Sequence, residues 1–380
     1  MRPFTFNPGP RLLVGPDQAQ SLAEKVPPGP CLFVTDTDLM GLGLTDAYRY
    51  AIAATHEVVV FDSVEADPSK DTLLAAAEAG RSAGVTSVVG FGGGSPMDVA
   101  KLAAYLLGSG DELDSIWGVA LAKGQRLPLA LVPTTAGTGS EATPISVITC
   151  EGGVKLAVNS APLIADWAML DATLTLGLPK HVTAATGIDA IVHAVEAYTS
   201  ARLKNPLSDA LAREALRLLS GNLLRVIDEP TDLEARSAML LGAHLAGLAF
   251  SNAPVAGVHA LAYPLGGLHH LPHGLTNALM LRHVLAHNLE AARDHYAELA
   301  EIIDPDCAGQ GSQARAALLI ERLDDLSRRS GLALRLRDHG IGFEEAPLLA
   351  REAMKQTRLL VNNPCEISES DAQRLYEAAW

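Results

Sequence analysis

Short apolar runs alternate with amphipathic segments over the first half of the chain, and this alternation predicts strands followed by helices. The runs are rich in Val, Leu, Ile and Phe, and several of them end at Gly, Pro or Asp. The predicted strands are 32–35, 57–61, 87–90, 129–132, 146–149, 155–158 and 168–171, and the predicted helices are 19–25, 73–83 and 96–107. Such alternation is typical of a doubly wound parallel sheet.

The pattern changes after residue 179, where strand-like runs become rare and apolar residues recur at i, i+3, i+4 and i+7. The predicted helices are 182–200, 208–227, 233–250, 275–288, 314–330 and 345–360. We therefore predict an α/β domain over residues 1–179 and an all-α domain over residues 180–380.

One stretch of the helical half, Ser237 to Leu281, contains no Asp, Glu, Lys or Arg. A membrane span needs about 20 consecutive apolar residues, and here Ser251, Asn252, three prolines and five histidines interrupt the run. Unpaired polar groups are costly in lipid. We interpret the stretch as a buried core around a polar site.

Charge and cysteine content restrict the class of protein. The chain has 29 Lys and Arg against 44 Asp and Glu, a net charge of −15, whereas a nucleic-acid binder needs clustered positive charge. The four cysteines, at positions 31, 150, 307 and 365, form no CxxC pair, which argues against a disulfide framework and favours a reducing compartment. No signal-type run opens the sequence. We expect a cytoplasmic protein with neither nucleic-acid nor membrane partners.

A glycine-rich loop follows the predicted strand 87–90. Three consecutive glycines, 92–94, precede Ser95-Pro96, and we expect Ser95 to be the N-cap of the next helix. Free backbone N–H groups and the helix dipole would then suit a diphosphate. The alternative is a plain strand–helix turn, because neither standard nucleotide-binding motif is present.

Two further features support a nucleotide site. The loop 132–141 follows another strand and places hydroxyl groups among small residues, so both loops would face one crevice at the carboxyl edge of the sheet. Asp36 ends the first predicted strand. Its carboxylate could accept hydrogen bonds from ribose hydroxyls and repel a 2′-phosphate, which favours NAD over NADP; the alternative is a helix N-cap.

Histidines are concentrated in the helical half, where seven of the twelve lie between residues 244 and 287. Upstream, Asp189 and His193 are four residues apart and share one face of a predicted helix. A buried carboxylate needs a partner. A divalent metal such as Fe(II), Zn(II) or Mn(II) would provide one, and a hydrogen-bonded Asp–His pair is the alternative.

Two more histidines, His259 and His273, could complete such a metal site. Pro264 and the Gly266-Gly267 pair lie between them and interrupt any continuous helix. We expect a re-entrant turn there that brings both histidines towards Asp189. A metal beside a nucleotide suggests alcohol or carbonyl redox chemistry, in which the metal acts as a Lewis acid on the alcohol oxygen and the alkoxide releases hydride to nicotinamide.

The motifs together resemble the iron-containing (group III) alcohol dehydrogenase family. They are GFGGGSPMDVAK, VPTTAGTGSE, GIDAIVHAVEAY, GVHALAYPLGG, LPHGLTNALML and a C-terminal NNPCEIS, and they cover most of the chain from residue 90 onwards. The resemblance implies the dehydroquinate synthase-like fold, with an NAD-binding α/β domain and a helical domain that binds metal and substrate. It also implies a homodimer or higher homo-oligomer.

Carried over residue by residue, the resemblance implies Fe(II), or alternatively Zn, held by Asp189, His193, His259 and His273. The implied NAD contacts are Asp36, Gly93, Gly94, Ser95, Asp98, Thr134, Thr135, Thr138 and Lys155. Tyr263 stands where many members have a histidine near the nicotinamide, and its ordinary pKa of about 10 makes it a poor base. We consider Tyr263 as a catalytic residue for proton transfer because of its position, and His270 as a second one because Tyr263 is a poor base. Cys365 replaces an arginine of the family pattern.

The predicted activity is that of a metal-dependent NAD(H) alcohol dehydrogenase or aldehyde or ketone reductase. Alternatives on the same fold are a hydroxyacid–oxoacid transhydrogenase and a maleylacetate reductase-like enzyme, although the latter lacks the full metal set. A dehydroquinate synthase-like lyase would need Lys and Arg for a phosphorylated substrate, and the uncharged stretch has none. Its apolar side chains suit a small or medium apolar alcohol.

Overall fold

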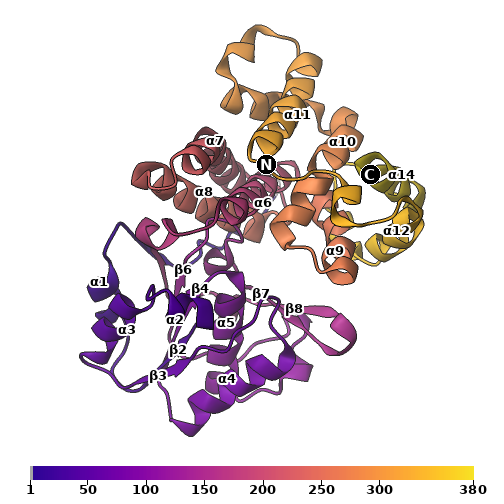
Figure 1. Ribbon diagram of the computed structural model, residues 1–380. Coiled ribbons are helices and arrows are strands. Elements are labelled where there is room, and N and C mark those ends of the chain that lie inside the picture. The colour runs from indigo at the N-terminus through magenta and orange to yellow at the C-terminus, as the bar shows by residue number, and fades with distance from the viewer. Residues whose placement is uncertain (1–2) are drawn as a thin grey trace. The chain divides into compact units, whose positions relative to one another are not determined.

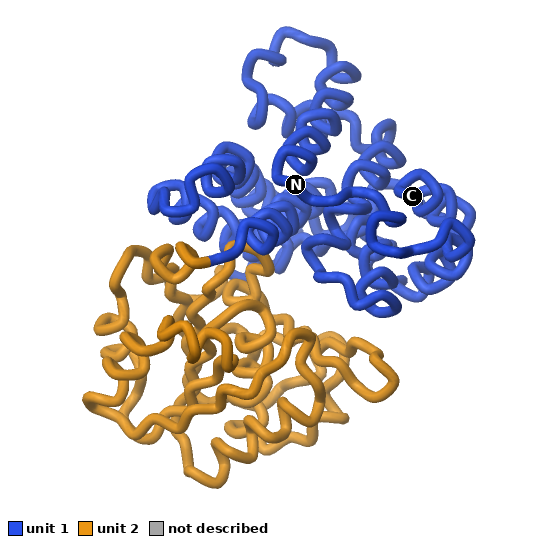
Figure 2. The backbone as a smooth tube through the Cα atoms, in the orientation of Figure 1, with its two compact units in different colours: residues 1–7, 178–380 blue, residues 8–177 orange. Residues whose placement is uncertain are grey.

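The computed structural model describes residues 3–380, which divide into two compact units (Figure 2). One unit runs from Pro8 to Gly177, and the other contains Leu178–Trp380 together with residues 3–7. Asn7 is held by the helical unit: its amide donates to Asn252 Oδ1 at 2.6 Å, and Asn252 Nδ2 donates back to its carbonyl at 3.0 Å. Asn7 therefore packs with the helical unit, although the sheet begins only a few residues later.

The α/β unit is built on a six-stranded sheet whose paired strands all run parallel. The strand order is β1-β9-β6-β4-β2-β3. The strands are β1 (Arg11–Val14), β2 (Cys31–Val34), β3 (Val58–Phe61), β4 (Ser87–Gly92), β6 (Leu129–Pro133) and β9 (Trp167–Leu170). The predicted parallel sheet is confirmed, with β1 as an added edge strand. Because β2, β4 and β6 are neighbours, their carboxyl ends share one edge.

Helices cover both faces of this sheet (Figure 1). They are α1 (Ala19–Ala23), α2 (Thr37–Gly41), α3 (Asp46–Ala53), α4 (Lys70–Ser82) and α5 (Gly94–Ser109). Side chains alternate along β2: Leu32 and Val34 join the core under α4 and α5, whereas Cys31 and Phe33 join the core under α1 and α3. This double cover is the predicted doubly wound arrangement.

A second, three-stranded sheet departs from the prediction. It contains β5 (Gly118–Val119), β7 (Ile145–Thr149) and β8 (Lys155–Asn159), and β7 pairs with β8 in antiparallel register. The sequence pattern assigned β7 and β8 to the parallel sheet. Residues 150–154 alone join them, and a parallel connection needs a crossover of a dozen or more residues, so a hairpin forms instead.

The second unit is helical, as predicted, and the long helix α6 lies at its centre (Figure 1). Its helices are α6 (Lys180–Thr199), α7 (Pro206–Asp228), α8 (Leu233–Asn252), α9 (Gly257–His269), α10 (His273–Ile303), α11 (Ser312–Arg329), α12 (Ala346–Met354), α13 (Thr357–Leu360) and α14 (Glu369–Ala379). Of the 20 residues of α6, 16 are buried, because α7, α8 and α10 all pack against it.

The uncharged stretch forms most of α8, all of α9 and the start of α10, and most of its residues are buried. The predicted interruption between His259 and His273 is confirmed, but it lies at residues 270–272 and not at Pro264 and Gly266-Gly267, because α9 continues through these residues. Pro264 gives up only one hydrogen bond, to the Ala260 carbonyl. The chain turns instead at residues 253–256 and at His270, whose left-handed φ of 55° ends α9.

Within residues 3–380, no single helix has both the length and the apolar composition of a membrane span, although α8 and α9 taken together do, with a bend of 105° between them.

Two predicted helices differ in extent. The segment 345–360 is split into α12 and α13, and the segment 275–288 belongs to the much longer α10.

Candidate active site

Helix α6 supplies the first two residues of a possible metal site. Asp189 and His193 lie one turn apart on the same face of α6, and both are buried. The pKa of Asp189 lies below its ordinary value. Burial alone would raise this pKa, but the neighbouring histidines and a hydrogen bond from Asn277 outweigh the effect of burial. The environment therefore favours the ionised carboxylate, which is the form that binds a cation.

Two other helix starts supply the remaining residues. His259 is the third residue of α9, and His273 is the first residue of α10. Gly274 allows α10 to approach α6 closely, because a Cβ at this position would lie only 2.3 Å from the Ala185 carbonyl oxygen. A larger residue would push the start of α10, and His273 with it, away from α6.

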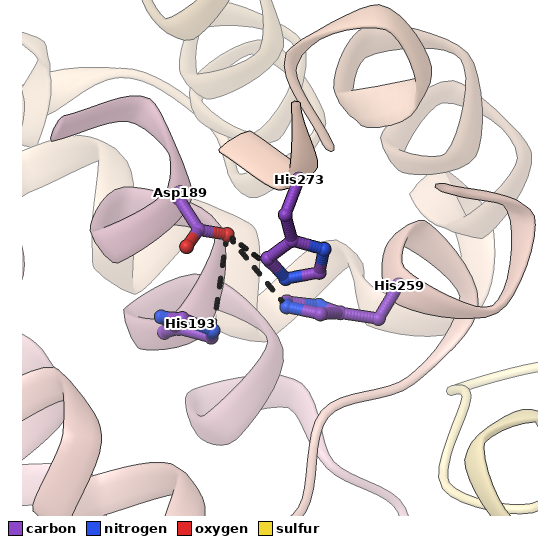
Figure 3. Close-up of side chains that lie close together, drawn as sticks. All are labelled: Asp189, His193, His259 and His273. Carbon is purple, nitrogen blue, oxygen red and sulfur yellow. Dashed lines mark ion pairs between the residues drawn. The ribbon is translucent and has the colours of Figure 1, made fainter. Parts of the chain in front are cut away.

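The four side chains converge on one point, as Figure 3 shows. Asp189 Oδ1 lies 3.8 Å from His193 Nε2, 3.9 Å from His259 Nε2 and 3.6 Å from His273 Nε2. All four possible ligand atoms lie within 4.8 Å of one another. Ligands at about 2.1 Å from a tetrahedral ion are about 3.4 Å apart, so a small contraction would close this set around a divalent cation. The Asp/His₃ donor set thus fits the expected metal.

A second layer of buried polar residues surrounds these side chains. Asn277, one turn after His273 on α10, donates from Nδ2 to Asp189 Oδ1 at 2.6 Å. Glu196 accepts a hydrogen bond from His259 Nδ1 at 2.7 Å. Neither residue was predicted from the sequence to belong to the site. The available signal was spacing, because Glu196 follows His193 by three residues and Asn277 follows His273 by four.

The metal site is closed on most sides and more open at His273. The side chain of His273 is 38% exposed, whereas those of Asp189, His193 and His259 are 5% exposed or less. Phe250 covers His193, with the two rings stacked at 4.4 Å between centroids. A catalytic metal site keeps one position accessible to substrate, and this arrangement would leave it beside His273.

The two residues considered for proton transfer lie at different depths. Tyr263 is one turn after His259 on α9, and its ring centroid lies 6.0 Å from that of His273. His270 caps the end of α9 in a left-handed conformation and is exposed. Tyr263 therefore lies beside the ring of His273, whereas His270 lies at the surface.

The glycine-rich loop joins β4 directly to α5, as predicted. Its N-cap is Gly93 rather than Ser95, so that detail of the prediction is wrong. Gly92 has a φ of 148°, which side-chain-bearing residues rarely adopt, and the turn is therefore completed before Ser95 is reached. No side chain caps the start of α5, which leaves N–H groups of its first turn available to an anion.

The loop 132–141, called the threonine-rich loop below, lies directly beside the glycine-rich loop. Thr134 N donates to the Gly92 carbonyl at 2.9 Å, continuing the pairing of β4 with β6. A Cβ on Gly94 would lie 3.1 Å from Thr138 Cγ2. A Cβ on Gly93 would lie 3.7 Å from the hydroxyl oxygen of Thr135. The two loops thus share one edge of the sheet.

Asp36 completes this edge at the end of β2, the strand next to β4. Its Oδ1 accepts a hydrogen bond from Leu39 N at 2.8 Å, so it is the N-cap of α2. Partial burial raises its pKa above the ordinary value. The helix cap uses only one carboxylate oxygen, so Asp36 can cap α2 and also accept a hydrogen bond from a ribose hydroxyl.

The structure gives two other predicted cofactor residues protein partners. The Asp98 carboxylate accepts hydrogen bonds from Ser140 Oγ at 2.6 Å and Val147 N at 2.8 Å, and it lies near the buried Lys101. These contacts tie α5 to the threonine-rich loop through Ser140 and to β7 through Val147. Lys155 lies on β8, outside the six-stranded sheet, and its ammonium pairs with an aspartate, Asp67, at 2.6 Å.

Known proteins match both units. The profile described as iron-containing alcohol dehydrogenase matches residues 9–172, and the C-terminal profile of the Fe-containing alcohol dehydrogenase family matches residues 183–380. Long-chain-alcohol dehydrogenase 1 of Geobacillus thermodenitrificans is 38% identical over 353 residues, which are 92% of this chain and 89% of that protein.

Solved structures agree with these matches. The crystal structure of a 1,3-propanediol oxidoreductase superimposes with a TM-score of 0.95 at 32% identity and covers 100% of both chains. Sulfoacetaldehyde reductase from Bifidobacterium kashiwanohense, solved in complex with NAD⁺, has a TM-score of 0.88 at 28% identity and covers 100% of this chain and 99% of that one. The chain belongs to the iron-containing alcohol dehydrogenase family.

Proposed function

We propose that this protein is a metal-dependent, NAD(H)-linked alcohol dehydrogenase that interconverts an alcohol and its aldehyde or ketone by hydride transfer. The observation that carries the proposal is the convergence of Asp189, His193, His259 and His273 within 4.8 Å. This cluster occurs in a chain whose relatives include alcohol dehydrogenases and propanediol oxidoreductases.

We assign the three neighbouring strand ends of the α/β unit to NAD. The open start of α5 is suited to the diphosphate, because unpaired N–H groups and the helix dipole both favour an anion. Asp36, at the next strand end, is suited to the ribose hydroxyls and would repel a 2′-phosphate. The NAD⁺ complex of the sulfoacetaldehyde reductase relative supports the choice of cofactor.

We assign Fe(II) to the Asp/His₃ cluster, on the basis of the family, with Zn(II) as the alternative, since carboxylate and imidazole ligands suit both ions. A divalent ion held there supplies Lewis-acid polarisation of the substrate oxygen. The chain itself keeps Asp189 ionised, shields three of the four ligands from water, and leaves access beside His273.

The substrate we propose is an apolar alcohol of small or medium size. Phe250 stacks on His193 and gives the metal site an aromatic wall. The stretch 237–281, which contributes α8, α9 and both later histidine ligands, has no Lys or Arg to recognise an anionic group. The helical unit therefore offers apolar contacts rather than charge pairing. We propose Tyr263 and His270 as the residues through which the alcohol proton leaves.

We also propose that the protein works in the cytoplasm as a homodimer or higher homo-oligomer. Its four cysteines are all free, which suits a reducing compartment. The edge strand β1 has an unpaired side, and Val14 at its end is 53% exposed, so self-association would cover an otherwise open edge. Light scattering of the purified protein would measure the oligomeric state.

The activity is tested by a screen of NADH oxidation over aldehydes, ketones and keto acids with iron- or zinc-loaded protein. We expect turnover with apolar aldehydes, and loss of both bound metal and activity in His273→Ala while NADH binding is retained. No turnover with any carbonyl, together with no bound metal, would contradict the proposal. Turnover of a hydroxy acid and a keto acid without added NAD would indicate a transhydrogenase instead.

A further inference from the structure

Glu196 is a buried carboxylate in the second layer around the possible metal site, and its role has not yet been assigned. It lies on α6, is 3% exposed, and accepts three hydrogen bonds. Oε2 accepts from Ala256 N at 2.9 Å and from His259 Nδ1 at 2.7 Å, and Oε1 accepts from Val258 N at 2.6 Å. All three donors belong to the start of α9, which carries a metal ligand.

The position of Glu196 on α6 links it to the metal site. Asp189, His193 and Glu196 are spaced by four and three residues, so their side chains lie on one face of the helix. Asp189 and His193 point to the ligand cluster (Figure 3). Glu196 lies one turn further along α6 and contacts the start of α9. A single helix face therefore supplies two ligands and a contact to a third.

Helix α9 depends on this contact for its N-terminal cap. Its N-cap residue is Ala256, and no side chain near the start of α9 in sequence provides a cap. Glu196 instead accepts the N–H groups of Ala256 and Val258, while Asn363 Oδ1 accepts that of Gly257 at 3.3 Å. A carboxylate at this end also complements the helix dipole.

The same carboxylate determines which nitrogen of His259 is available to a metal. An ionised carboxylate can only accept hydrogen bonds, so the contact at 2.7 Å requires the proton to be on His259 Nδ1. The lone pair is then on Nε2, the atom that lies 3.9 Å from Asp189 Oδ1. Carboxylate–histidine–metal arrangements of this kind orient the imidazole and increase its basicity.

We infer that Glu196 is a positioning residue for the metal centre, which fixes the tautomer and direction of His259 while it caps α9. The inference rests on the metal site proposed above. A purely structural cap would contribute to the stability of α9 without changing the affinity of the folded protein for metal, and this difference makes the inference testable.

The test compares Glu196→Gln with Asn363→Ala in the full-length protein. Both variants remove a cap contact at the start of α9, but Asn363 touches Gly257 and not His259. The glutamine introduced by Glu196→Gln would turn an amide donor towards groups that are themselves donors. Cobalt(II) affinity is measured by competition with a chromophoric chelator, and the cobalt absorption spectrum reports ligand geometry. Thermal unfolding of the metal-free proteins reports the loss of the cap.

We expect Glu196→Gln to raise the cobalt dissociation constant by about 10- to 100-fold and to change the cobalt spectrum. Asn363→Ala should lower the melting temperature while changing cobalt affinity much less. If Glu196→Gln does not fold, Glu196→Asp, which keeps the charge on a shorter side chain, is expected to weaken cobalt binding in the same direction. Cobalt affinity within twofold of the wild type in the folded Glu196 variant would overturn the inference. Failure of the wild-type protein to bind cobalt would contradict the proposed metal site itself.

Discussion

The glycine-rich and threonine-rich loops, which we assign to NAD, and the Asp/His₃ cluster, which we assign to a metal, are built in opposite ways. The loops are continuous segments in which small residues bring backbone groups to the carboxyl ends of β4 and β6. The metal cluster consists of four side chains from three helices, separated by as many as 84 positions between residues 189 and 273. We therefore expect the loops to be disrupted by substitutions that add side-chain atoms, and the Asp/His₃ cluster to be disrupted by substitutions that remove them.

The two regions also differ in what holds them in place. Direct backbone pairing fixes the loops, as between Thr134 N and the Gly92 carbonyl. The metal ligands depend on other buried side chains, because Asn277 holds Asp189 and Glu196 holds His259. Substitutions should therefore separate the two functions cleanly.

The largest effect is expected from Asp189→Ala, which removes the only anionic member of the ligand set. Without it we expect bound metal to be lost and activity to fall by about 1,000-fold or more, equivalent to several kcal/mol of metal catalysis. NADH binding, measured by fluorescence titration, should change by less than about twofold, because a change in one unit leaves the backbone loops of the other intact. Parallel loss of metal and NADH binding in a folded variant would contradict the separation.

The converse substitution is Gly94→Val in the glycine-rich loop. A Cβ at residue 94 already lies 3.1 Å from Thr138 Cγ2, and overpacking of this kind costs about 1–3 kcal/mol. We expect NADH affinity to fall by about tenfold or more, with metal content unchanged. Gly221→Val, in α7, is the matched control, because a Cβ there meets nothing within 4 Å. Equal NADH affinity in both variants would count against the loop.

A smaller effect is expected from Asp36→Asn. Asparagine is about as good an N-cap as aspartate, so the hydrogen bond from Leu39 N and the stability of α2 should be retained. Loss of the negative charge should weaken discrimination against the 2′-phosphate. We expect the NADH to NADPH ratio of kcat/KM to fall by about tenfold. An unchanged ratio would show that Asp36 only caps α2.

The smallest effects concern proton transfer. Tyr263→Phe removes only the phenol hydroxyl and keeps the ring, and we expect kcat to change by less than about threefold. His270→Ala should alter the pH dependence of alcohol oxidation more clearly than Tyr263→Phe does. The pH–rate profiles of the two variants decide between them, and an unchanged profile for His270→Ala would remove His270 from the proton path.

Much of the fold could be predicted from the sequence, because the local pattern determines it. The apolar runs of the buried strands and the spacing of α6 to α8 identified these elements. The hairpin of β7 and β8 was missed because strand direction depends on pairing, which periodicity does not reveal. The break expected at Pro264 was misplaced because neighbouring helices bury α9 and compensate for the hydrogen bond that proline lacks.

The four side chains that converge were all identified from the sequence, because a pair on one helix face and two histidines beside turn-forming residues are visible there. Their binding of a metal stays a prediction. The supporting residues were not identified. Glu196 and Asn277 act through contacts between helices that are far apart in sequence. Their spacing from His193 and His273 puts them on the same helix faces as these histidines, but spacing alone does not reveal the contacts. Similarly, Asp98 lies in a recognised motif, but only the fold reveals its contact with the Val147 amide.

The central claim is that one divalent metal binds where α6, α9 and α10 meet. Anomalous diffraction from crystals of the zinc- or iron-loaded protein tests this most directly. We predict one strong peak per chain, about 2.0–2.2 Å from an Asp189 oxygen and from Nε2 of His193, His259 and His273. The absence of a peak at this position in metal-loaded crystals, or a peak held by other residues, would contradict the account.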